Sequence, residues 1–187
     1  RNPAPGTCVT VTIEGRRPLV AEVQALIAPT SAPQPRRVTS GLDSSRIAMM
    51  LGVLERRAGV KLATADCFVA TVGGVRLAEP ATDMAVALAI ASSAADRALP
   101  AGLVAFGEIG LAGDVRPIGS LERRLAEAHR LGFTEAIIPA RALRARGPAA
   151  GPPVGMRIHE VGSIHEAIAT AQRLSRTDTS DPTRQEA

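Results

Sequence analysis

The chain has 187 residues, of which 45 % are apolar and 21 % are charged, and its net charge at neutral pH is +4. This length and apolar content suit one domain with a substantial core. No apolar run reaches the roughly 18 residues that a membrane-spanning helix needs, so we expect a soluble, cytoplasmic protein with no membrane partner.

The N-terminal half predicts a hairpin followed by a helix. Residues 8–13 alternate between apolar and polar, and residues 18–27 continue as an apolar run after a glycine turn. Residues 28–40 are proline-rich and basic, which is typical of a surface loop, here ending in a short strand. From residue 45 to 59 apolar side chains recur at helical spacing, which predicts an amphipathic helix.

The middle of the chain predicts a buried helix and a second hairpin. Residues 68–75 have the composition of a strand, and residues 80–95 are nearly all small and apolar, which is typical of a helix without a polar face. Residues 103–109 and 114–118 predict two strands around a glycine turn. Ser120 is expected to cap the next helix, whose predicted buried side carries Leu121, Leu125, Ala128 and Gly132.

The C-terminal part predicts a strand over residues 135–139, a loop over 141–154 and a last helix. Ser163 and Glu166 have the spacing of a capping box. Beyond Arg176 no core pattern continues, so we expect a disordered tail. The order of strands and helices predicts an α/β or α+β domain with a mixed sheet.

Several kinds of chemistry have no signature here. The pattern GxxxxGK[ST] of an ATP-binding loop does not occur, and the glycines at 73–74 and 107–113 fit turns. The three histidines are scattered, and Cys8 and Cys67 stand alone in strand-like stretches, which favours buried thiols over a zinc site. The sequence therefore predicts no metal and no cofactor within this chain.

Arginine dominates the basic residues, because Lys61 is the only lysine. A lysine can be tuned into a general base, whereas an arginine stays protonated, so Lys61 is the one candidate of that kind. Tyrosine and tryptophan are absent, and the three phenylalanines have core-like neighbours. Any nucleic acid would therefore be held mainly by arginine contacts to phosphates.

Two motifs carry a resemblance to a known family. Residues 79–85 (EPATDMA) and 107–119 (GEIGLAGDVRPIG), with the order of elements from about 6 to 174, resemble the proteolytic domain of Lon proteases. The resemblance implies that family's α/β fold, which is like the second domain of a small-subunit ribosomal protein. It also implies a serine nucleophile activated by a lysine. Their positions are Ala81 and Glu122 here, so no catalytic residue is expected. Thr82 offers a hydroxyl without a lysine.

A narrower resemblance rests on residues 35–50, 52–57 and 72–83. They are similar to the C-terminal Lon-like domain of the RadA (Sms) family of bacterial DNA repair proteins, which also lacks the Lon dyad. The resemblance implies a linker over 1–6 from a missing ATPase core, a degenerate Lon-like domain over 7–175 and a tail over 176–187. ATP, magnesium and zinc would belong only to the missing N-terminal domains.

The same resemblance implies a hexameric ring of this chain that works on single- or double-stranded DNA, with RecA as a further candidate partner. We expect DNA phosphates to be contacted, without reading of base sequence, by some of Arg36, Arg37, Arg46, Arg56, Arg57, Arg76, Arg116, Arg123 and Arg124.

Three alternatives remain open. Surface ion pairs, such as Arg123 with Glu127 or Arg56 with Glu55, would leave these arginines structural. The domain could instead be an oligomerisation scaffold without DNA contact. It could also be an active peptidase with an unrecognised nucleophile.

Overall fold

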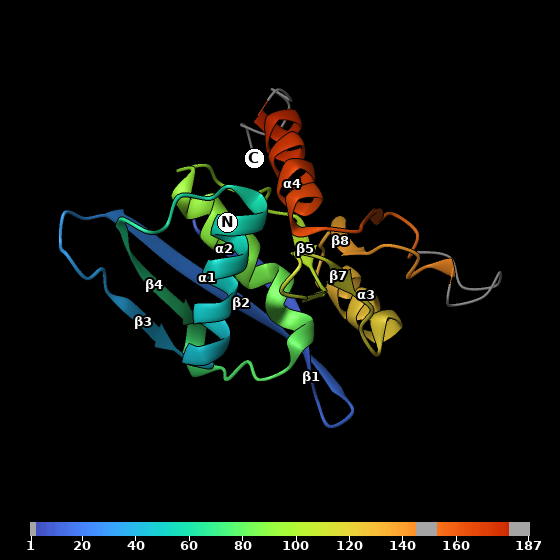
Figure 1. The fold of residues 1–187 in the computed structure, drawn as a ribbon. Helices are drawn as coiled ribbons and strands as arrows, with labels where there is room; N and C mark the ends of the chain where they lie inside the picture. Colours follow the sequence, from blue (N-terminus) through green and yellow to red (C-terminus); the bar gives the residue numbers. More distant parts are fainter. Residues whose placement is uncertain (1–2, 145–152, 180–187) are drawn as a thin grey trace.

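A seven-stranded mixed sheet forms the centre of the molecule (Figure 1). The structure is a computed structural model that describes residues 3–144 and 153–179. The strand order is β3-β4-β2-β1-β5-β8-β9, and β2 runs antiparallel to both β1 and β4 while the other neighbours are parallel. This confirms the predicted α/β class. The strands are β1 (Thr7–Glu14), β2 (Arg17–Pro29), β3 (Arg37–Ser40), β4 (Ala65–Thr71), β5 (Leu103–Ala105), β8 (Glu135–Pro139) and β9 (Arg157–Val161).

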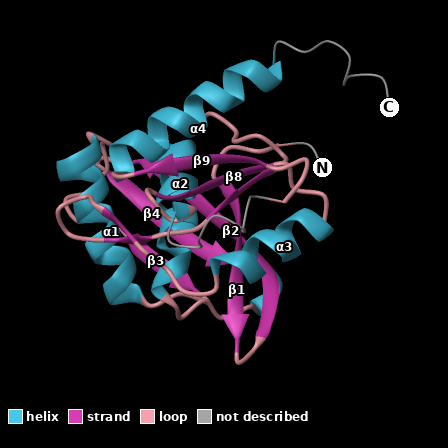
Figure 2. Ribbon diagram, turned by 90° about the vertical axis from the view of Figure 1, so that its right-hand side faces the viewer, coloured by secondary structure: helices cyan, strands magenta, loops and turns pink. Residues whose placement is uncertain are grey.

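The helices lie on both faces of this sheet (Figure 2). Successive strand residues point to opposite faces, and the core is accordingly divided in two. One cluster joins Cys8, Val23 and Leu103 to three helices, which are α1 (Ser44–Ala58), α2 (Asp83–Ala94) and α4 (Ile164–Thr179). The other cluster joins Val9 and Phe106 to α3 (Leu121–Arg130). Helix α3 therefore covers the opposite face, over β1, β5, β8 and the part of β2 around Val20.

Local signals explain where most helices begin and end. The Asp43 side chain accepts a hydrogen bond from the Arg46 N–H at 2.8 Å, and Gly59 ends α1 in the left-handed conformation. Ser163 Oγ accepts from the Glu166 N–H at 3.1 Å, and Glu166 accepts from the Gly162 N–H at 2.8 Å. The predicted capping box at α4 is thus confirmed, with the reciprocal bond displaced by one residue.

The start of α3 differs from the prediction. Ser120 has φ 57°, and its side chain makes no capping hydrogen bond. Gly132, expected on the buried side, is exposed because the helix has already ended at Arg130. Ser120 thus stands at the predicted N-cap position but contributes no capping hydrogen bond, and the predicted last position of the buried stripe was wrong.

Two predicted strands begin or end at residues other than those expected. The run 103–109 divides into β5 and β6 (Glu108–Ile109), and β6 pairs with β7 (Val115–Arg116) in a separate two-stranded sheet. The chain leaves the main sheet there because the Gly107 N–H donates to the carbonyl of Ala81, outside the sheet. The strand predicted from residue 68 begins at Ala65 instead, and a 3-10 turn replaces its last residues.

Helix α4 continues to Thr179, past the residue at which the tail was predicted to begin. Residues 180–187 of that tail, 145–152 of the predicted loop and 1–2 of the predicted linker lie outside the described residues. Cys8 and Cys67 are buried free thiols, as predicted. No helix in the described ranges is long and apolar enough to cross a membrane.

The two serines that precede helices provide a matched test of this account. We expect Ser163→Ala to lower the free energy of unfolding by about 1 kcal/mol, because it removes an N-cap hydrogen bond. Ser120→Ala should lower it by much less, because Ser120 makes no such bond. Urea unfolding followed by circular dichroism measures both, and equal losses would contradict the assignment of the caps.

Candidate functional site

The two residues at the dyad positions of the resemblance lie on different elements. Ala81 is in the 3-10 turn Pro80–Thr82 that precedes α2, is 6 % exposed, and its carbonyl accepts from the Gly107 N–H at 2.9 Å. Glu122 is exposed on the first turn of α3. A methyl group cannot attack a carbonyl carbon, and a carboxylate does not supply the amine that this chemistry uses.

Thr82 is the nearest hydroxyl along the chain, and it is already engaged. Its side chain is buried, and Oγ1 donates to the carbonyl oxygen of Glu79 at 2.8 Å. Lys61 is exposed in the loop before β4, outside the turn that leads into α2. Lys61 is therefore not placed to take a proton from Thr82.

An ion pair between a buried arginine and a half-buried glutamate joins α3 to the turn before α2. The Arg124 guanidinium, 3 % exposed, donates to both carboxylate oxygens of Glu79 at 2.5 and 2.9 Å. It also donates to the carbonyl of Val11 at 2.7 Å and to that of Gly119 at 3.0 Å. Glu79 accepts a further hydrogen bond from the Ile13 N–H at 2.9 Å. The pair thus joins β1, the turn before α2 and α3.

Both side chains of this ion pair stay ionised at neutral pH. Burial by itself would raise the pKa of Glu79, but the hydrogen bonds from Arg124 and from the Ile13 N–H outweigh it and hold the pKa below its usual value. An arginine cannot be deprotonated in a protein. The pair therefore stabilises three elements and has no proton to transfer at neutral pH.

The burial of Arg124 corrects one prediction made from the sequence. Arg124 was expected to contact DNA, but it is buried and its donors are bound inside the domain. Helical spacing could have predicted the burial of Arg124, because this residue lies three residues after Leu121 and four before Ala128. Those are positions on the apolar stripe of α3.

A second ion pair joins α1 to α2. Arg46 donates through Nε to Asp83 at 2.6 Å and through a second nitrogen to the other carboxylate oxygen. Asp83 is 3 % exposed and also accepts from the Ile109 N–H at 3.0 Å. Burial raises the pKa of Asp83, against the opposing effect of these hydrogen bonds. Arg46 is therefore held within the fold, although a third of its side chain is exposed.

The other candidate arginines divide into bound and free groups. Arg36 pairs with Asp66 at 3.0 Å, Arg116 lies 3.5 Å from Asp114, and Arg37 donates to the carbonyl of Leu62 at 2.9 Å. Four others are exposed and form no ion pair within the described part of the chain: Arg56, Arg57, Arg76 and Arg123.

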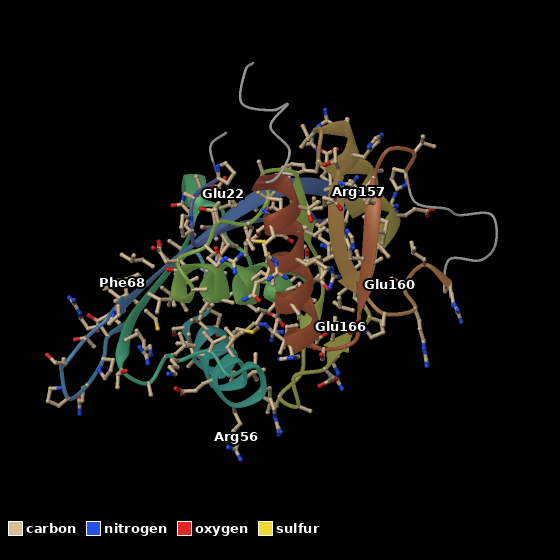
Figure 3. The ribbon with its side chains drawn as sticks, turned by 90° about the horizontal axis from the view of Figure 1, so that it is seen from above. Glu22, Arg56, Phe68, Arg157, Glu160 and Glu166 are labelled. Atoms are coloured by element: carbon tan, nitrogen blue, oxygen red, sulfur yellow. The ribbon has the colours of Figure 1, made fainter. Side chains whose placement is uncertain are left out.

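Neither alternative ion pair of the sequence analysis forms. Glu127 binds Arg130 at 2.7 Å instead of Arg123, and Glu55 accepts from the N–H groups of residues 62 and 63. The free arginines do not make one patch, because Arg56 (Figure 3) and Arg57 lie in the last turn of α1 whereas Arg123 lies on α3, on the other face of the sheet.

The described residues contain no group of three histidine, cysteine or acidic side chains that could hold a metal ion. His159 lies 2.7 Å from Glu135, which Arg157 also binds. The histidine pattern gave no sign of this pair, because the two residues are brought together by the pairing of β8 with β9.

Comparison with known proteins agrees with this fold. The profile of the Lon protease (S16) C-terminal proteolytic domain matches residues 63–173. The chain therefore belongs to that family. Its particular relatives are proteins named DNA repair protein RadA, and the chain is similar to their C-terminal Lon-like domain, as predicted.

The identity is 45 % with the protein of Mycolicibacterium smegmatis over 91 % of this chain and 35 % of that protein. It is 44 % with the protein of Synechocystis over 89 % of this chain and 32 % of that protein, and 43 % with the protein of Escherichia coli over 90 % and 36 %. The chain thus spans about a third of the length of these relatives.

The buried pair can be tested with single and double substitutions. We expect Arg124→Met to lower the free energy of unfolding by about 3 kcal/mol or more, because it leaves the Glu79 carboxylate without its partner. The double variant Glu79→Gln/Arg124→Met should recover part of this loss, because no unpaired charge remains. Urea unfolding of the wild type, the single variants Arg124→Met and Glu79→Gln, and the double variant measures the coupling between the two residues, and additive effects would contradict a shared interaction.

The pKa of Glu79 predicts how stability depends on pH. Because the folded-state pKa is lower than the unfolded one, the pair stabilises the fold above the unfolded pKa and is lost as pH falls through the folded pKa. Glu79→Gln should therefore flatten the fall in melting temperature below pH 5. If the melting temperature of this variant falls below pH 5 as steeply as that of the wild type, other carboxylates cause the fall.

Proposed function

We propose that this chain is a non-catalytic Lon-like domain of a RadA-type DNA repair protein. In this proposal it serves as one tier of a hexameric ring and contacts DNA phosphates during the processing and branch migration of recombination intermediates. ATP hydrolysis would belong to a part of the protein other than this chain. The observation that carries the proposal is the Arg124–Glu79 ion pair, which lies two residues along the chain from Glu122 and Ala81, the positions where the resemblance expects a base and a nucleophile.

The local chemistry supports the loss of peptidase activity. Acyl transfer needs a nucleophilic atom and a group that can accept its proton. Ala81 has no such atom, the Thr82 hydroxyl donates to a backbone carbonyl, and Glu79 is kept ionised by an arginine. The site retains backbone contacts that shape the turn, such as that of Gly107 with Ala81.

The charge distribution supports a DNA contact that does not read sequence. The chain has a net charge of +4, and Arg56, Arg57, Arg76 and Arg123 remain exposed without an ion pair in the described residues. Exposed arginines gain affinity by releasing counterions from phosphates. A ring multiplies a weak contact, because several copies act on one DNA molecule.

A scaffold without DNA contact is the second candidate function. It is favoured by the ion pairs of Arg36, Arg46 and Arg116, which already satisfy their charges within the domain. The two functions differ in one measurable respect, since a pure scaffold would show no salt-dependent affinity for DNA.

The absence of peptidase activity is a direct prediction. We expect no cleavage of casein or of fluorogenic peptides by the purified chain, because neither Ala81 nor Thr82 can act as a nucleophile. Mass spectrometry of the products and of the protein would detect cleaved peptides or an acyl-enzyme. Turnover that disappears in Thr82→Ala would overturn the non-catalytic assignment.

Phosphate contact is tested by reversing charge on α1. We expect Arg56→Glu/Arg57→Glu to weaken binding to DNA and to reduce the slope of log affinity against log salt by up to about two, because each phosphate contact contributes about 0.9. Fluorescence anisotropy with unrelated sequences measures both quantities.

Arg16→Glu/Arg17→Glu is the matched control, since it makes the same charge change at two exposed arginines outside the candidate set. Equal losses in the two variants would indicate a general effect of charge rather than a contact at α1. A flat salt dependence of the wild-type chain would remove the DNA contact from the proposal.

A further inference from the structure

A pocket of about 260 Å³ lies at the amino ends of the parallel strands β1 and β5. Its walls come from the first residues of β1, the facing residues of β2, the segment before β5 and Phe133, which follows α3. The volume is slightly below the roughly 300 to 1,000 Å³ of pockets for drug-sized ligands. The pocket therefore suits a small molecule or one long side chain. We call it the β1–β5 pocket.

Most of the wall of the β1–β5 pocket is apolar. Cys8 and Leu103 line it from one buried cluster, and Val9 lines it from the other. Phe133 packs against the second cluster and is half-buried, although its neighbours in the sequence predicted a core position. It brings an aromatic side chain to the wall. The apolar stem of a ligand therefore finds a surface against which it leaves water.

The polar groups of the pocket are rich in hydrogen-bond acceptors. Glu22 Oε1 accepts from the side-chain nitrogen of Gln24 at 3.0 Å, so Gln24 directs a donor to Glu22 and also carries an amide oxygen. Thr7 adds a hydroxyl group. A carboxylate has about four lone-pair positions. Glu22 therefore has room to accept from a ligand in addition to its partners within the chain.

Glu22 gives the pocket a negative charge. It is the one charged side chain among the described residues that line the pocket, in a chain whose net charge is +4. An anionic ligand would be repelled by this carboxylate, and an apolar ligand would displace its water without replacing the hydrogen bonds. A cationic ligand avoids both costs. In Figure 3, Glu22 and Arg56 lie at opposite edges of the molecule, so the pocket is separate from the arginines at the end of α1.

We propose that the β1–β5 pocket binds a guanidinium group on a short alkyl stem. A guanidinium carries five N–H donors and no acceptor, which matches the acceptors of Glu22, Gln24 and Thr7. It pairs with a carboxylate through two parallel hydrogen bonds and stacks on aromatic rings. The stem lies along the apolar wall while the charged head reaches Glu22. This binding goes beyond the proposed function, because it needs neither a ring nor DNA.

Two kinds of ligand carry this chemistry, which are a small alkylguanidine and an arginine side chain of a bound peptide. A lysine-type ammonium fits less well, because it is more strongly hydrated and cannot form the two parallel hydrogen bonds. The charge and the planar shape of the head group are thus the features to vary in a test.

The test measures binding of matched probes to the isotope-labelled chain by nuclear magnetic resonance. The small probes are butylguanidinium and its uncharged analogue butylurea. The peptide probes are acetyl-Ala-Arg-Ala-amide and the same peptide with citrulline in place of arginine. We expect both guanidinium probes to shift the amide signals of Thr7, Cys8 and Phe133. The uncharged probes should bind at least about tenfold more weakly, because they lose a charged hydrogen-bonded pair.

Three variants locate the binding. Glu22→Gln keeps the shape of the side chain and removes its charge, so we expect at least about tenfold weaker binding of both guanidinium probes. Ala101→Trp places a large side chain at an exposed position of the pocket and should block them. Glu14→Gln is the matched control, because Glu14 is exposed and lies outside the pocket. Circular dichroism confirms that all three are folded.

The proposal is refuted by equal affinity for charged and uncharged probes, by unchanged binding to Glu22→Gln, or by equal losses in Glu22→Gln and Glu14→Gln. The absence of any shift with the wild-type chain refutes it as well. Binding of the arginine peptide at least about tenfold tighter than butylguanidinium assigns the pocket to a polypeptide partner. Equal affinities of these two probes assign it to a small alkylguanidine.

Discussion

The Arg124–Glu79 ion pair is the interaction on which the geometry of this domain depends. It connects α3 and the turn before α2, and the Arg124 hydrogen bond to Val11 extends the connection to β1. A buried charge without a partner is costly, so each of these three segments constrains the others. Arg124 also donates to the carbonyl of Gly119, just before the start of α3, where Ser120 makes no side-chain capping bond.

The same pair determines what chemistry the site can perform. A hydrolytic site of this kind needs a proton acceptor whose pKa lies near neutrality. An arginine cannot supply one, and it keeps the neighbouring glutamate ionised. The domain thus combines the fold of the Lon proteolytic family with a site held by an ion pair, and its relatives are named for DNA repair.

The helices cover the two faces of the sheet unevenly. Helix α3 packs over β1, β5 and β8, while α1, α2 and α4 occupy the other face. The β3–β4–β2 part therefore keeps an exposed apolar row, with Arg36 at its border. On the helix side, the short β6–β7 sheet stands apart from the main sheet and leaves a hollow beside α1. Both surfaces follow from the order of the strands rather than from any one motif.

The sequence by itself determined the fold class, the buried helix α2, the capping box at Ser163 and the family, because these depend on local periodicity and on continuous motifs. Only the tertiary structure decided which arginines are free. Arg124 and Arg46 have partners that are distant in sequence, Glu79 and Asp83, and composition cannot reveal such pairs. Phe68 has the neighbours of a core residue, yet its exposure depends on which part of the sheet α3 covers. The burial of a side chain depends on how the layers of the fold pack, and local sequence predicts it only where another element covers the apolar side of a helix or strand.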